Sequence, residues 1–143
     1  MTSIVGVQVG LATKANPPSK DELEAFRRDV SDLMIANGRS LYSYIDRGLD
    51  YAIRSRIDGW YEPSIHRSAI QLLIDDYPGG SSVFDEEALD LLDEMDEMLN
   101  DRAPDVPPLP ESIIPPGMPE SHWWWHLPSG DPGEVAARDH LLS

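Results

Sequence analysis

The sequence contains no cysteine, which excludes disulfide bonds and thiolate chemistry. It also has no apolar run long enough to span a membrane. The first 18 residues lack a basic n-region, and Gln8 interrupts their apolar run, so they predict a short extended strand or arm rather than a signal peptide. These features suit a reducing compartment, and we expect a cytoplasmic protein that makes no membrane contacts.

Basic residues are scarce, and the acidic excess is concentrated in the second half of the chain. Residues 1–84 carry 11 acidic and 9 basic side chains, whereas residues 85–143 carry 15 acidic side chains and only Arg102 and Arg138 as basic ones. The formal net charge of −15 repels nucleic acid and membrane surfaces and attracts basic proteins. Two interpretations remain open: the acidity serves solubility alone, or it serves a basic protein partner.

No sequence signature of catalysis is present. The chain has no Gly-x-Ser-x-Gly turn, and the glycines at 79–80 are not followed by the lysine of a phosphate-binding loop. His122 and His126 have the spacing of a metal-binding pair, but no third ligand follows, and we expect both at the edge of an aromatic patch. His66 is expected at the surface, and Arg67 in surface ion pairs. The sequence therefore predicts no catalytic residue, no metal ligand and no cofactor.

Four segments have apolar residues at helical spacing and predict α-helices over residues 19–38, 40–59, 63–77 and 81–102. Ser19 and Glu22 form a capping box at the first start, and Ser82 or Asp85 caps the fourth helix. Gly48 lies inside the second helix, where it predicts the close approach of a neighbouring helix. The apolar stripes predict a core that contains Leu23, Phe26, Val30, Leu33, Met34, Leu41, Ile45, Leu49, Ala52, Ile53, Ile57, Ile65, Ala69, Leu72, Leu73, Tyr77, Ala88, Leu91, Leu92, Met95, Met98 and Leu99.

Residues 104–119 hold seven prolines, which exclude a helix or a central strand there. We expect an extended, polyproline-like arm, followed by a short last helix capped by Asp131 with Pro132 at its first position. The predicted fold class is all-α, or mainly α. It comprises a small four-helix bundle-like domain with a short N-terminal extended segment (residues 1–103) and a proline-rich, Trp-containing acidic arm (residues 104–143) that packs on it.

Three consecutive tryptophans stand between two histidines in the stretch SHWWWHLPSG, residues 121–130. Consecutive side chains cannot all point the same way, so we expect the triplet to be split. If the stretch is extended, Trp124 faces opposite to Trp123 and Trp125. The pair on one face would pack on the bundle, and the remaining tryptophan would lie at the surface near the acidic fourth helix.

Small size, strong negative charge and an aromatic cluster together favour a protein-binding inhibitor. The hypothesis is an immunity or antitoxin protein that neutralises a basic, nuclease-type toxin, with charge steering for fast association and aromatic anchors for slow dissociation. Three alternatives remain open: a nucleic-acid mimic that inhibits a DNA- or RNA-binding enzyme, an adaptor whose arm docks on a partner, and an enzyme with an unfamiliar site under the arm. The predicted partner-binding residues are Trp123, Trp124, Trp125, Asp90, Asp93, Glu94, Asp96, Glu97 and Asp101.

Overall fold

A computed structural model describes residues 19–36 and 38–130, and these residues form helices and connecting segments without any strand. The elements are α2 (Lys20–Ala36), α3 (Gly38–Ile53), α4 (Ser55–Asp58), α5 (Tyr61–Asp76), α6 (Gly80–Val83) and α7 (Glu86–Arg102), followed by the 3₁₀ helices η1 (Ala103–Asp105), η2 (Glu111–Ile113) and η3 (Trp123–His126). The expectation of a mainly α domain is therefore confirmed. The expected N-terminal extended segment and the expected last helix after Asp131 lie outside the described residues.

The helix boundaries follow local chemistry. The Glu22 backbone N–H donates to the Ser19 hydroxyl at 3.1 Å, as the capping box predicts. Asp85, rather than Ser82, caps α7 by accepting the Ala88 backbone N–H at 2.8 Å. The helix expected over residues 40–59 is interrupted at Arg54, so that α3 and the short α4 replace it. At this break the Ser55 hydroxyl donates to the Ala52 carbonyl at 2.8 Å, where its bond competes with the helical backbone pattern.

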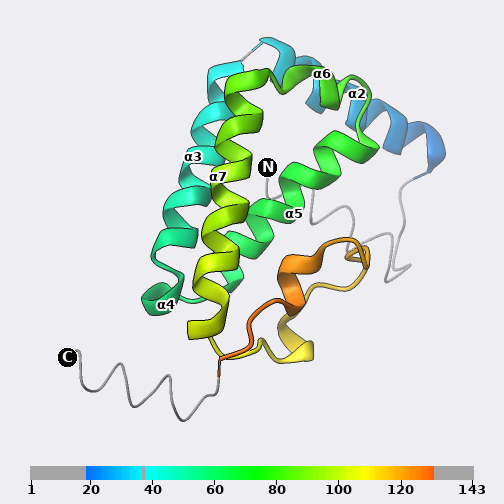
Figure 1. Ribbon diagram of the computed structural model, residues 1–143. Helices are drawn as coiled ribbons and strands as arrows, with labels where there is room; N and C mark the ends of the chain where they lie inside the picture. The colour runs from blue at the N-terminus through cyan, green and yellow to red at the C-terminus, as the bar shows by residue number, and fades with distance from the viewer. Residues whose placement is uncertain (1–18, 37, 131–143) are drawn as a thin grey trace.

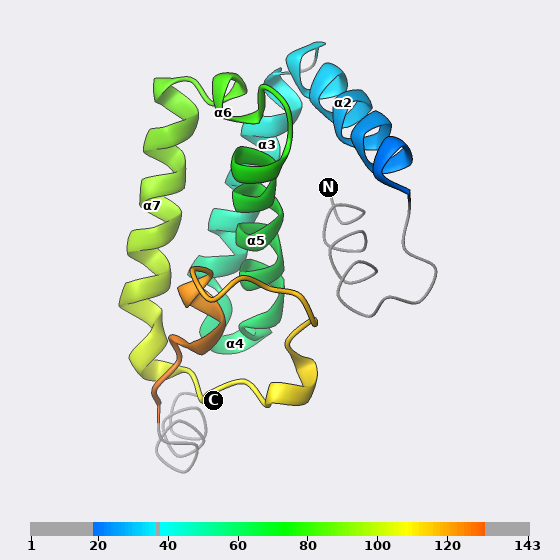
Figure 2. The same ribbon diagram turned by 90° about the vertical axis from the view of Figure 1, so that its right-hand side faces the viewer.

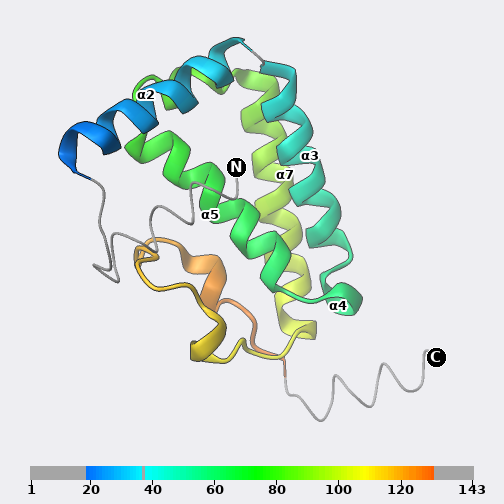
Figure 3. The same cartoon turned by 180° about the vertical axis from the view of Figure 1, so that it is seen from behind.

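Helices α3 and α7 lie side by side and run in the same direction, and α5 crosses them obliquely in the opposite direction (Figures 1 and 3). Helix α2 lies at one end of this arrangement, close to α6 (Figure 1). It contacts the end of α5 through the Phe26 and Tyr77 rings, whose centroids are 6.3 Å apart. Among the described residues, no helix is long and apolar enough to cross a membrane.

The core lies between α3, α5 and α7, and residues such as Ile45, Leu73 and Met95 are fully buried in it. The close approach predicted at Gly48 is confirmed, because a Cβ atom there would lie 3.1 Å from the end of the Met95 side chain. Three expected core residues are instead exposed: Leu33, Ile53 and Ile57. Leu33 lies on α2, which touches only one end of the bundle, and Ile57 follows the helix break, which shifts it off the α3 stripe.

After α7 the arm leaves the helices, crosses one face of α5 and returns to its starting point (Figure 2). The return is fixed by backbone bonds from Ser129 N–H to the Ala103 carbonyl at 3.1 Å and from Gly130 N–H to the Val106 carbonyl at 2.9 Å. A Cβ atom on Gly130 would meet the Pro104 carbonyl at 2.8 Å, so only glycine fits this closure. The expectation of a wholly extended arm is wrong at η1 and η2, where the proline-rich chain tightens into single 3₁₀ turns.

Candidate functional site

A buried polar cluster joins the arm to the middle of α5. The indole N–H groups of Trp124 and Trp125 each donate to the Ser68 hydroxyl oxygen at 2.8 Å, and that oxygen lies 2.9 Å from Nδ1 of His122. All four side chains are at most 1% exposed. We call these four residues the Ser68 hub, because every one of the three arm residues reaches the same oxygen atom.

The hydrogen bonds at the Ser68 oxygen determine the protonation state of His122. An indole N–H can only donate, and a hydroxyl has two acceptor lone pairs and one proton. The two indoles therefore occupy both lone pairs of Ser68, and its single proton must go to Nδ1 of His122. Because Nδ1 accepts, the ring is neutral and carries its own proton on Nε2. Burial, with a smaller contribution from the Arg67 guanidinium, lowers the pKa of His122 from 6.5 to about 4, in agreement with a neutral ring.

Two further contacts hold Trp124 in place. Its backbone carbonyl accepts the indole N–H of Trp60, which is itself buried, at 2.7 Å. The Arg67 guanidinium lies 4.5 Å from the centroid of the Trp124 ring, within cation–π range. Arg67 also donates twice to the Asp96 carboxylate, at 2.7 and 3.2 Å, and is 6% exposed. The expected surface ion pair of Arg67 is therefore a partly buried, bidentate pair, which connects α5, α7 and the arm.

The triplet is split as two buried residues and one partly exposed residue, but the residue at the surface is Trp123 rather than Trp124. Trp123 is 38% exposed, and its ring meets the Trp124 ring edge-on at a centroid distance of 5.3 Å. The stretch forms the 3₁₀ helix η3 instead of an extended segment. Successive side chains then project about 120° apart, so two neighbours, Trp124 and Trp125, share the inward side. Of the three tryptophans proposed for partner binding, Trp123 alone is accessible with the arm in place.

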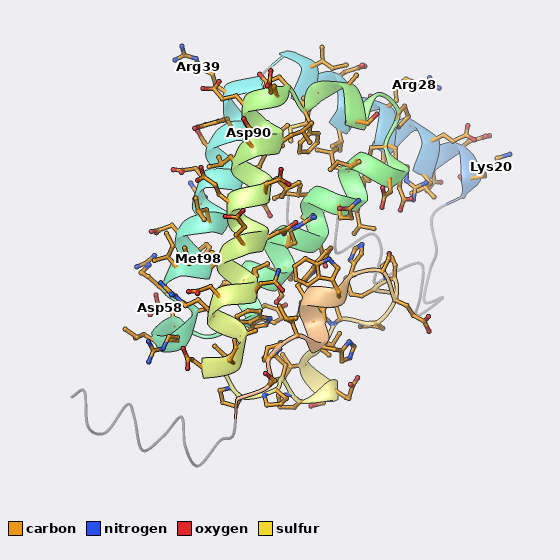
Figure 4. All side chains as sticks on the ribbon, viewed as in Figure 1. Lys20, Arg28, Arg39, Asp58, Asp90 and Met98 are labelled. Atoms are coloured by element: carbon orange, nitrogen blue, oxygen red, sulfur yellow. The ribbon has the colours of Figure 1, made fainter. Side chains whose placement is uncertain are left out.

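The expected acidic residues separate into two groups. Asp96 faces α5 and is bonded to Arg67, which gives it a structural role that its sequence context did not reveal. The other five lie on the exposed side of α7, away from the core residues of that helix; Figure 4 labels one of them, Asp90. We call this group the acidic ridge: Asp90, Asp93, Glu94, Glu97 and Asp101.

The remaining histidines differ from their expected positions. His66, expected at the surface, is 6% exposed and stacks on Tyr44 with a centroid distance of 4.4 Å, and burial lowers its pKa. His126 is exposed as expected and lies 3.0 Å from a Glu111 carboxylate oxygen, whereas His122 is buried on Ser68. The two histidines of the expected pair thus have separate partners. Within residues 19–36 and 38–130, no three His, Cys, Asp or Glu side chains are grouped to hold a metal ion.

The Ser68 hub brings a serine and a histidine to hydrogen-bond distance, a pair that can form a nucleophile and its base in hydrolases. Here Ser68 is fully buried, and its oxygen accepts two bonds, so both lone pairs that would attack a substrate are occupied. The arrangement therefore holds the arm and is closed to a substrate. Comparison of the chain with protein-family models, curated proteins and solved structures finds no match.

Proposed function

We propose that the protein is an inhibitor that binds a basic protein partner through the acidic ridge, in the manner of an immunity or antitoxin protein acting on a nuclease-type toxin. The observation that carries this proposal is that the ridge is exposed and largely unpaired. Asp90, Asp93, Glu94 and Glu97 have no ion-pair partner within the part of the chain that the structure describes.

The ridge opposes folding rather than assisting it. Residues three or four positions apart are neighbours on a helix surface, and like charges there cost several tenths of a kcal/mol per pair. The ridge contains such pairs at Asp90/Glu94, Asp93/Glu97 and Glu97/Asp101. Carboxylates in the last turn also face the negative end of the helix dipole. A row of charges that destabilises its own helix is consistent with a role outside the fold.

A basic partner would gain from this surface in two ways. The negative potential along α7 would raise the rate of encounter, by factors of about 10 to 1000 at low ionic strength. Trp123 adds a partly exposed aromatic side chain, the residue type most enriched in interface hot spots. Trp123 connects to α7 through contacts with Trp124, Arg67 and Asp96, so a continuous series of contacts links the aromatic side chain to the acidic helix.

The test compares two triple variants of equal charge. The ridge variant replaces Asp93→Asn, Glu94→Gln and Glu97→Gln. The control replaces three exposed acids of α2, with Asp21→Asn, Glu24→Gln and Asp29→Asn. Wild type is used to capture a partner from native lysate, and the association rate of that purified partner is then measured for all three proteins at several salt concentrations.

We expect a basic enzyme whose activity is lost at equimolar inhibitor. Its association rate should fall about tenfold or more for the ridge variant and change much less for the control, with a steeper salt dependence for wild type than for the ridge variant. Equal association rates for the ridge and α2 variants would contradict the proposal, because the attraction of the partner would then depend only on the net charge of the protein and not on the acidic ridge. A captured partner that keeps its full activity would instead support the adaptor alternative.

A further inference from the structure

Residues 106–110, in the first part of the arm, form a short extended segment that we call the PPII segment. Residues 107–110 belong to no helix or turn. Pro110 has φ −59° and ψ 138°, close to the values of a polyproline II helix, and Val106 is extended as well. Val106, Pro107 and Leu109 each precede a proline, which restricts them to the same region. Figure 2 shows the chain between η1 and η2 along the lower edge of the described residues.

One edge of the PPII segment faces the helices, and the other two face outwards. A polyproline II helix has three residues per turn, so Val106 and Leu109 lie on the same edge. Val106 is buried and Leu109 packs against the core, which fixes the orientation of the segment. Pro107 and Pro110 then share the second edge, and Pro108 lies on the third. Pro108 and Pro110 are exposed, and Pro107 is partly buried.

Two other pairs of prolines in the described part of the chain have the same spacing but not the same geometry. The pair Pro104 and Pro107 begins inside η1, where the backbone is 3₁₀-helical. The pair Pro116 and Pro119 is separated by Gly117, whose φ of 86° is incompatible with a polyproline II helix. Pro107 and Pro110 are therefore the pair that stands on one edge of a regular polyproline II turn.

The backbone of the PPII segment is held at both ends and open in between. The Val106 carbonyl accepts the Gly130 N–H at 2.9 Å, and the Pro110 carbonyl accepts the Ile113 N–H at 3.0 Å. No backbone N–H of the described residues donates to the carbonyls of residues 107–109. A segment already held in its binding conformation loses little entropy on association. Its open carbonyls are also available as acceptors for another molecule.

Protein domains that recognise proline-rich segments dock them, as polyproline II helices, in a groove lined by aromatic side chains. We propose that the PPII segment is the ligand of such a domain, and that basic side chains border the groove of this partner. The charge requirement follows from the flanks of the segment. Asp105 precedes it and the exposed Glu111 follows it, and residues 103–130 contain no lysine or arginine. A groove with an acidic border would be repelled.

The test uses the full chain and a panel of purified SH3 and WW domains, sorted by whether acidic or basic side chains border the aromatic groove. The segment variant carries Pro107→Ala and Pro110→Ala. The matched control carries Pro116→Ala and Pro119→Ala, which removes two exposed prolines of the same spacing from the same arm. We expect a domain with a basic border to bind wild type with a Kd below about 1 mM. The segment variant should bind at least about tenfold more weakly, and the control like wild type.

A second pair of variants tests the charge requirement without changing any proline. Glu111→Gln removes the exposed carboxylate beside the PPII segment, and Glu120→Gln removes another exposed carboxylate of the arm. The first should weaken binding about threefold and the second much less, although both change the net charge equally. Because both residues are exposed, this comparison stays valid if the segment variant also loosens the arm.

The inference does not depend on the inhibitor proposal, since the PPII segment belongs to the arm and the acidic ridge to α7. It is overturned if no domain of the panel binds wild type, or if domains with acidic borders bind as tightly as those with basic ones. Equal binding of the two proline variants, or of the two glutamate variants, would also overturn it.

Discussion

Replacing Ser68 with alanine should release the arm, because a single oxygen atom serves three buried partners. Ser68→Ala keeps the Cβ atom and removes only the hydroxyl. The indole N–H groups of Trp124 and Trp125 then lose their acceptor, and Nδ1 of His122 loses its donor. All of these groups are buried, so water does not replace the missing bonds unless the arm moves.

The expected magnitude follows from the number of groups left without a partner. A buried polar group that loses its hydrogen bond costs about 1–3 kcal/mol. The two indole N–H groups are the least adaptable, since they can only donate. We expect a loss of about 3–5 kcal/mol in the free energy of unfolding, against a total of about 5–15 kcal/mol for a domain of ordinary stability. At an m-value of about 1.5–2 kcal/mol per molar urea, the midpoint should fall by about 2 M.

The control is Ser64→Ala, one helical turn earlier on α5. Ser64 is also fully buried, but its hydroxyl oxygen has no hydrogen-bond partner among the described residues. Removing it should leave stability unchanged or raise it slightly, because an unsatisfied hydroxyl is removed. Urea unfolding followed by far-UV circular dichroism and by tryptophan fluorescence measures both variants. Ser68→Ala should also shift tryptophan emission to the red before the helices unfold. If the two serine variants have equal midpoints, the hub does not hold the arm and the reasoning fails.

Three other substitutions and a change of pH also have distinct expected effects on the free energy of unfolding. Trp124→Ala should lower the free energy of unfolding by about 3–5 kcal/mol, whereas Trp123→Ala, at a partly exposed position, should lower it by less than about 1 kcal/mol. Gly130→Ala should cost about 1–3 kcal/mol, because its Cβ atom would overlap the Pro104 carbonyl, which is backbone and cannot rotate away. Protonation of His122 opposes folding, because burial lowers its pKa from 6.5 to about 4. The contribution of the neutral His122 ring to the free energy of unfolding should therefore be constant above pH 6.5 and decline as the pH falls from 6.5 to 4, by about 3 kcal/mol in total. An NMR titration of the His122 ring with a midpoint near 6.5 in the folded protein would contradict this.

The helices were predictable because their information is local. Apolar residues at a spacing of three and four, with Ser19 at one start and Asp85 at another, specify helices whatever the rest of the chain does. Gly48 also carried a usable signal, since glycine inside a helix is retained where a neighbour lies close. The same periodicity misplaced Leu33, because a stripe identifies an apolar face but not whether another helix reaches that end of it. It also misplaced Ile53 and Ile57, which lie at and after the end of α3, because the stripe did not show the helix break.

The hub was not predictable in the same way, because its partners lie far apart in the chain. Ser68 and His122 are separated by 54 positions, and no local pattern connects them. One signal was nevertheless present. Ser68 lies between Ile65 and Leu72 at helical spacing, so a polar residue occupies a position on the buried stripe of α5. Buried polar groups require partners, and a serine at such a position indicates a tertiary hydrogen bond without identifying its donor.

The division of the tryptophan triplet separates stability from recognition in a testable way. Trp124 and Trp125 are committed to the Ser68 oxygen, and Asp96 is committed to Arg67, so these residues contribute to a partner complex only by holding the arm. Trp123 and the acidic ridge make few interactions within the fold and are free to make them elsewhere. For the partner captured by wild type, Trp123→Ala should therefore raise the dissociation rate with little change in unfolding midpoint, since a hot-spot aromatic acts mainly on dissociation. Ser68→Ala should raise the same rate only together with a lower midpoint. If Trp123→Ala leaves dissociation unchanged while the ridge variant slows association, recognition is electrostatic alone and the aromatic part of the proposed interface is wrong.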